Sequence, residues 1–138
     1  VPAFSFGFLD AEGNVVRDPT FPDLPSFKEV CEATAGCETS GVAWDAWKAF
    51  FTAGFASQKL IYLPGTASQE VVDMYTKALE DMVAHPDFAE ASAETLGVYP
   101  QAIGDAALVA HESAITITPE AKQYVLDWLE ADYGVTMN

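Results

Sequence analysis

The residues of this chain that could do acid–base, nucleophilic or metal chemistry are few and widely spaced. Its two histidines are His85, beside a proline, and His111, at the end of an alanine-rich segment. Neither stands at metal-ligand spacing from the other or from a cysteine, so we expect no metal site. His111-Glu112-Ser113 contains the residue types of a catalytic triad, but adjacent residues rarely converge on one reacting atom. The sequence also lacks a glycine-rich phosphate loop and a nucleophile elbow, and we expect neither an enzyme nor a bound cofactor.

The two cysteines, Cys31 and Cys37, admit two interpretations. A continuous helix would place them about 9 Å apart along its axis, which is too far for a disulfide. Gly36 between them is a good residue for ending a helix and turning the chain back. A small disulfide loop would then form, and it would indicate an oxidising compartment. Two free buried thiols are the alternative.

The charge of the chain excludes several classes of partner. Its 138 residues carry six Lys plus Arg against 21 Asp plus Glu, for a net charge of −15. Such a chain repels phosphate backbones and anionic membrane surfaces, which argues against nucleic acid. Arg17 is the only arginine, so an anion would have to be held mainly by backbone N–H groups, hydroxyls and water. Solubility alone is the plainer explanation of the acidity.

The chain is organised around residues 60–84. The apolar run 60–63 has the length and residue types of a strand, and Pro64-Gly65 must end it. Thr66 or Ser68 then caps a long amphipathic helix, and Thr66 with Gln69 has capping-box spacing. Together these features predict one strand–turn–helix step of an α/β fold. Ligands often bind where such strands end, although most of these steps only hold a sheet together.

The other elements follow from similar signals. Gly7, within a predicted strand, allows a close backbone approach. Trp44, Trp47, Phe50 and Phe51 stand at helical spacing and favour an aromatic core face. We predict an α/β fold in one unit over residues 1–138, with a short sheet flanked by several helices. The predicted strands are 4–9, 15–16, 60–63 and 98–99, with 115–117 extended; the predicted helices begin near 26, 44, 68, 88, 104 and 119, the last capped by Thr118.

From about Phe21 onward the chain resembles the C-terminal half of the extracytoplasmic receptors of tripartite tricarboxylate transporters. Residues 22–29 look like that family's proline-aspartate segment, with Ser26 where threonine is usual. Residues 44–51 followed by 63–66 are similar to its passage from a tryptophan into a proline-glycine-threonine turn. Residues 68–88 and then Leu96-Gly97 resemble the two helices that follow in the family.

The resemblance implies a periplasmic, two-lobed, non-catalytic binding protein. Such receptors close on a small carboxylate and deliver it to the membrane subunits of a tripartite transporter. By position it implies Asp23, Pro25 and Ser26 as ligand-binding residues, with Trp44 as a weaker candidate. It also implies that the chain is the C-terminal half of a longer receptor and pairs with a missing N-terminal half. The alternative is a stand-alone interaction module that reuses this lobe, as a homodimer, without ligand transport.

Overall fold

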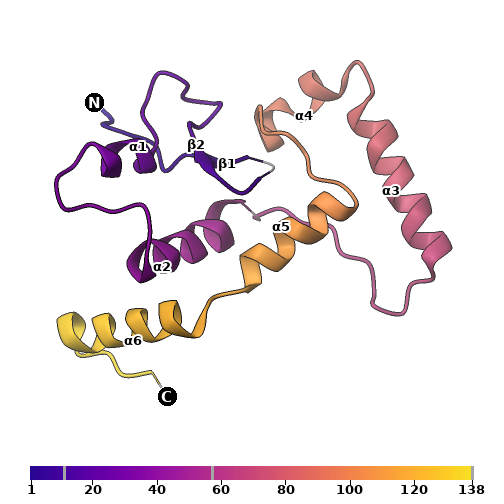
Figure 1. Cartoon of the computed structure of the whole chain (residues 1–138). Helices are drawn as coiled ribbons and strands as arrows, with labels where there is room; N and C mark the ends of the chain where they lie inside the picture. The colour runs from indigo at the N-terminus through magenta and orange to yellow at the C-terminus, as the bar shows by residue number, and fades with distance from the viewer. Residues whose placement is uncertain (11, 57, 138) are drawn as a thin grey trace.

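The computed structural model describes residues 1–10, 12–56 and 58–137 and is rich in helix (Figure 1). One short sheet lies near the N-terminus, and helices make up most of the remaining regular structure. The elements in chain order are β1 (Phe8–Leu9), β2 (Val15–Val16), α1 (Phe27–Glu32), α2 (Val42–Phe51), the π-helical turn η1 (Thr52–Ala56), α3 (Gln69–Val83), α4 (Phe88–Leu96), α5 (Asp105–Ile115) and α6 (Pro119–Tyr133). The prediction of a mixed fold with a short sheet and several helices is confirmed at this coarse level, while the two-lobed arrangement stays a prediction.

The N-terminal hairpin forms where its sequence predicts it. β1 and β2 pair antiparallel, with Phe8 opposite Val16 and Leu9 opposite Val15. The turn is closed by Asp10, whose carboxylate accepts hydrogen bonds from the backbone N–H groups of Asn14 (2.7 Å) and Glu12 (3.1 Å). The bonds from Asn14, the largest cause, lower the pKa of Asp10 because they stabilise its charged form. The strand predicted over 4–9 is otherwise reduced to a single parallel bridge at residue 5.

The predicted strand at 60–63 is wrong. These residues belong to no strand, and Ile61 and Tyr62 are 71% and 64% exposed. A four-residue apolar run becomes a strand only when a neighbouring strand supplies ladder partners, and β1 and β2 pair only with each other. The central strand–turn–helix step is therefore absent. The same lack of a partner explains why residues 98–99 form no strand.

Helix ends follow local capping signals more closely. The Ser68 side chain accepts from the N–H of Val71 and caps α3, so Ser68 is the N-cap, and the capping box predicted from Thr66 does not form. Thr118 caps α6 as predicted, by accepting from the N–H of Ala121 at 3.1 Å. Gly134 ends that helix in the left-handed conformation. α5 runs to Ile115, so the expected extended segment begins only at residue 116.

The core lies around α2, and its buried apolar residues are Val15, Cys31, Ala46, Phe51 and Ala121. Aromatic rings border it, and three of them, Phe4, Phe6 and Phe55, remain exposed. A closed circuit of ring contacts joins Phe4, Phe6, Phe55, Phe51, Trp47 and Phe27, with centroid separations from 4.7 to 6.3 Å. The expected aromatic core face of α2 is confirmed for Phe51, which is 4% exposed, but Phe50 points outward and is 61% exposed. On another side α2 packs against α6 (Figure 1). The buried small side chains Ala46 and Ala121 lie on these two helices and allow close approach.

The segment between these two core helices is far more open. From Ala53 to Glu120, none of the residues whose burial is described is buried. α3 packs against α4, and both stand to the right of the hairpin and α2 in Figure 1. The Tyr99 hydroxyl donates to the carboxylate of Asp18 at 3.0 and 3.1 Å, which ties the α4–α5 connection to the N-terminal part. We call residues 58–117 the arm.

No helix in the described part of the chain combines the length and apolar character that crossing a bilayer requires.

Candidate functional site

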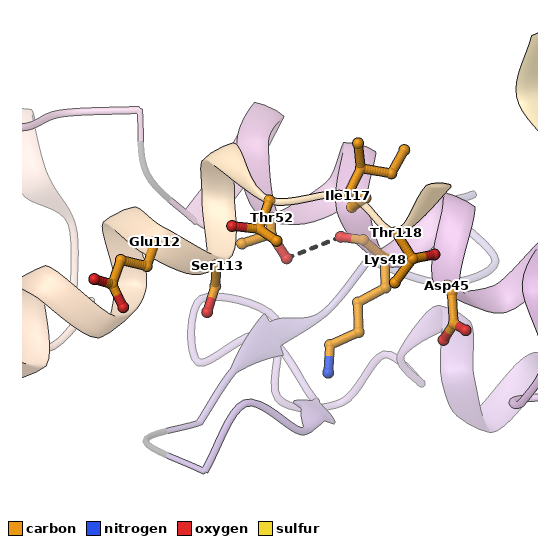
Figure 2. Close-up of a pocket in the computed structure, with 9 residues that line it drawn as sticks. Asp45, Lys48, Thr52, Glu112, Ser113, Ile117 and Thr118 are labelled. Atoms are coloured by element: carbon orange, nitrogen blue, oxygen red, sulfur yellow. Dashed lines mark hydrogen bonds between the residues drawn. The ribbon is translucent and has the colours of Figure 1, made fainter. Parts of the chain in front are cut away.

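A hollow of about 390 Å³ lies between α2 and the α5–α6 connection. Two distant segments line it, one from α2 and η1 and the other from the end of α5 to the start of α6 (Figure 2). Its lining is dominated by hydroxyl and charged side chains: Asp45, Lys48, Thr52, Glu112, Ser113, Thr116 and Thr118, with Ala49 and Ile117.

Lys48 is the one cation among the described residues that line the hollow. Among the residues that the structure describes, its ammonium forms no ion pair or hydrogen bond. Arg17, Lys28 and Lys77 are ion-paired and Lys59 donates to the Thr95 carbonyl, while Lys122 on α6 is also unpaired within the described part of the chain. Figure 2 shows the Lys48 ammonium directed away from the backbone of α2, between Ser113 on one side and Asp45 on the other. An unpaired ammonium with three free donors is a ready partner for a carboxylate.

The hydroxyl groups differ in what they have left to offer a ligand. Buried Thr52 donates its hydroxyl to the Lys48 carbonyl at 2.8 Å, so its oxygen remains only as an acceptor. Thr118 accepts from the N–H of Ala121, and its own O–H stays free to donate. Ser113 and Thr116 form no side-chain hydrogen bond within the described residues. The hollow therefore offers one ammonium and three hydroxyl donors.

Two carboxylates, Asp45 and Glu112, flank this donor set. Neither is ion-paired to Lys48 or to any other described residue. They repel ligands of high negative charge, and they can accept hydrogen bonds from hydroxyl groups of a ligand. The start of α6 also lies at the hollow through Thr118, and the positive end of its dipole favours an anion there. The arrangement suits a small molecule with one carboxylate.

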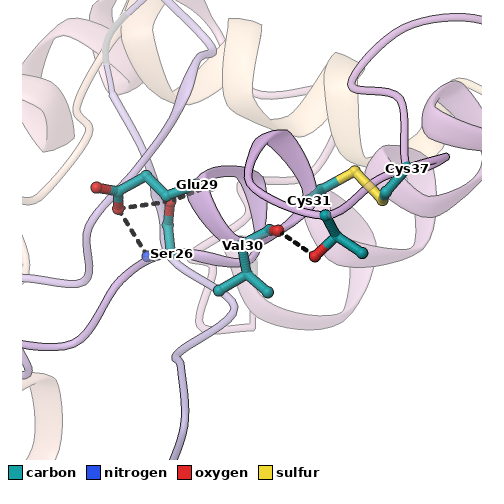
Figure 3. The surroundings of a disulfide bond; sticks show 6 residues. Ser26, Glu29, Val30, Cys31 and Cys37 are labelled. Carbon is teal, nitrogen blue, oxygen red and sulfur yellow. Dashed lines mark hydrogen bonds between the residues drawn. A yellow bond between two sulfur atoms is a disulfide. The ribbon is translucent and has the colours of Figure 1, made fainter.

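The ligand-binding residues expected from the sequence lie away from this hollow. Ser26 is 1% exposed, and its hydroxyl is engaged in a capping box at the start of α1. The Ser26 hydroxyl donates to the Glu29 carboxylate at 3.0 Å and accepts from the Glu29 N–H at 3.3 Å. Figure 3 shows Ser26 and Glu29 together with the nearby disulfide. Asp23 is exposed and Pro25 half-buried, and both precede α1. Trp44 lies half-buried in the aromatic cluster, 4.5 Å from Trp47 between ring centroids.

The capping box is joined to an ion pair. Glu29 receives two hydrogen bonds from the Arg17 guanidinium, at 3.0 and 3.1 Å, and one from the Ser26 N–H at 2.8 Å. These bonds, with those from Arg17 the largest cause, lower the pKa of Glu29 from 4.5 to about 2. In return Glu29 raises the pKa of Arg17. The single arginine therefore fastens the loop before α1 and is not directed at the hollow.

Of the two interpretations of the cysteines, a disulfide or two free thiols, the structure shows the disulfide between Cys31 and Cys37 (Figure 3). α1 ends at Glu32, earlier than Gly36, so the chain turns back and brings the two Cα atoms to 5.1 Å. Thr34 closes the turn by donating its hydroxyl to the Val30 carbonyl at 2.7 Å.

His111 does not form a catalytic arrangement with Ser113. His111 Nδ1 lies 3.2 Å from the Tyr62 hydroxyl, and the two rings meet edge to face. Residues 111 and 113 are two positions apart on α5, and such residues do not face each other on a helix. Within the described part of the chain, no cluster of three or more His, Cys, Asp and Glu residues could hold a metal ion.

Sequence reasoning missed Lys48 and the hydroxyls of the hollow. The signal it could have used is the segment 113–118, where Ser113, Thr116 and Thr118 crowd around a helix start. Nothing local indicates that Lys48 lies beside them. No protein-family model, curated protein or solved structure matches the chain.

Proposed function

We propose that the chain is a binding protein that captures a small organic carboxylate in the hollow between α2 and the α5–α6 connection. The observation that carries the proposal is the unpaired ammonium of Lys48, which lines the same hollow as the free hydroxyls of Ser113, Thr116 and Thr118 in a chain of net charge −15. In a protein this acidic, a cation left without a carboxylate partner is a ready-made anion contact.

An extracytoplasmic location and delivery to a membrane transporter belong to the same proposal. The Cys31–Cys37 disulfide supports it, because such bonds persist in oxidising compartments outside the cytosol. The family resemblance supports it as well, since those receptors hold carboxylates largely through hydroxyls, backbone amides and water. The proposal moves the binding site from Asp23, Pro25, Ser26 and Trp44 to Lys48 and its neighbours.

The test is calorimetric titration of the chain with acetate, lactate, succinate and citrate. We expect the monocarboxylates to bind best, because Asp45 and Glu112 repel additional negative charge. Lys48→Met should weaken binding by about tenfold or more, the effect of losing one charge-assisted hydrogen bond.

Lys122→Met is the matched control. Lys122 is exposed on α6, lies outside the hollow and has no ion pair among the described residues. The substitution changes the net charge by the same amount as Lys48→Met, so it should leave the affinity nearly unchanged. Equal weakening by both variants would mean that only the overall charge matters. Absence of binding by all four acids would refute the proposal.

A further inference from the structure

The chain exposes more surface than a self-sufficient protein of its size. Its accessible surface is 9999 Å². A folded monomer of 14.8 kDa is expected to expose about 7,000 Å². The excess of about 3,000 Å² is larger than the share that one protomer contributes to an obligate interface, about 1,000 to 2,500 Å². The chain therefore exposes enough surface for an interface of that size.

The arm contributes to this exposed surface, because none of its residues whose burial is described is buried. Large apolar side chains stand exposed along it, among them Tyr62, Tyr75, Met82, Leu108 and Ile115. The core around α2, by contrast, contains Val15, Cys31, Phe51 and the two alanines that are buried. The exposed apolar side chains that recur at regular spacing on one helix are the ones that suit an interface.

Helix α3 supplies the most regular part of this surface. Val72, Tyr75, Leu79 and Met82 follow one another at spacings of three, four and three residues. This is the spacing at which a second helix packs along the first. Tyr75 and Met82 are both 46% exposed, so the stripe is only partly covered. Because α3 has 15 residues, it is about 22 Å long, and the stripe runs along most of that length.

We propose that the apolar stripe of α3 is the centre of an interface with a second copy of this chain. A two-fold dimer uses the same patch on both protomers, so a self-complementary stripe supplies both halves of the interface. An obligate dimer buries about 1,000 to 2,500 Å² on each protomer, which would remove a third or more of the excess.

The charges beside the stripe give this dimer a distinctive salt dependence. α3 carries Glu70, Asp73, Glu80 and Asp81 against one lysine, Lys77, which is bound to Asp81 at 2.6 Å. Two copies therefore bring like charges together, and each protomer has a net charge of −15. Salt should strengthen the dimer, because it screens the repulsion and leaves the apolar contact intact.

The test is sedimentation equilibrium at about 0.1 M and about 1 M salt, where the Debye length falls from about 10 Å to about 3 Å. We expect a dimer whose dissociation constant decreases as salt increases. Met82→Glu should raise that constant about tenfold or more, since it places a carboxylate in the apolar contact.

Met74→Glu is the matched control. It makes the same substitution on the same helix, at a residue that is 60% exposed and lies off the stripe. Both side chains are substantially exposed in the protomer, and circular dichroism verifies that both variants stay helical. A chain that remains monomeric at both salt concentrations would overturn the proposal. A dimer weakened equally by both variants, or weakened by salt, would overturn it too.

Discussion

Removal of the Cys31–Cys37 disulfide should destabilise the chain by about 2.3 kcal/mol. The bond spans a sequence separation of 6, and closing a loop of this length removes about 8 cal/mol/K of entropy from the unfolded chain. Cys37→Ala is the preferred change, because Cys37 is exposed whereas Cys31 is 2% exposed and helps fill the core. The variant thus loses the constraint without opening a cavity.

The assay is urea unfolding followed by tryptophan fluorescence and circular dichroism, with and without a thiol reductant. The midpoint should fall for Cys37→Ala with the slope of the transition nearly unchanged. Reductant should bring the wild type to the same midpoint and leave the variant where it is. If Cys37→Ala lost less than about 0.5 kcal/mol, the loop-entropy reasoning would be refuted. Two thiols titrating in the unreduced protein would refute the bond itself.

Two further predictions concern the N-terminal part. Gly7→Ala should cost more stability than Gly13→Ala: both glycines have positive φ, but a Cβ on Gly7 would lie 2.5 Å from the Val16 carbonyl oxygen, whereas Gly13 has open space. Chemical unfolding should show about 1 kcal/mol lost at Gly13 and clearly more at Gly7, and equal losses would contradict the reasoning. Glu29→Gln should lower stability at neutral pH, because Arg17 holds the pKa of Glu29 at about 2. Since a depressed pKa stabilises the fold above the ordinary value and loses that effect as pH falls, the difference from wild type should shrink from pH 4.5 down toward 2; a constant difference would contradict it.

Local signals predicted the helices well, because their physics lies within a few residues. Thr118-Pro119 begins α6 and Gly134 ends it through bonds that span no more than one or two turns. The expected close approach at Gly7 is also confirmed, by the Val16 carbonyl against its α-carbon. The prediction of a strand at residues 60–63 was wrong, because a strand needs a neighbouring strand to pair with and the local sequence does not show whether one is present.

The hollow could not be predicted from the sequence either, because its lining also comes from segments that are distant in the sequence. Lys48 and Ser113 are distant in the sequence, and they meet only because α5 packs against α2 and η1. Ser26 was expected at a ligand site by its position in the family resemblance, and that expectation stays a prediction. The spacing of Ser26 and Glu29 is itself that of a capping box, and the structure forms this box.

The packing of α2 against α6 determines how the length of the arm affects the free energy of folding. These two helices, on either side of residues 58–117, close one large loop whose contents contribute no described buried residue. Loop-closure entropy grows only with the logarithm of length, by about 0.6 kcal/mol for each doubling. Within this loop α5 packs against α2 and η1, whereas α3 and α4 pack against each other. A change in the length of the connection between α3 and α4 should therefore cost the core little through loop closure.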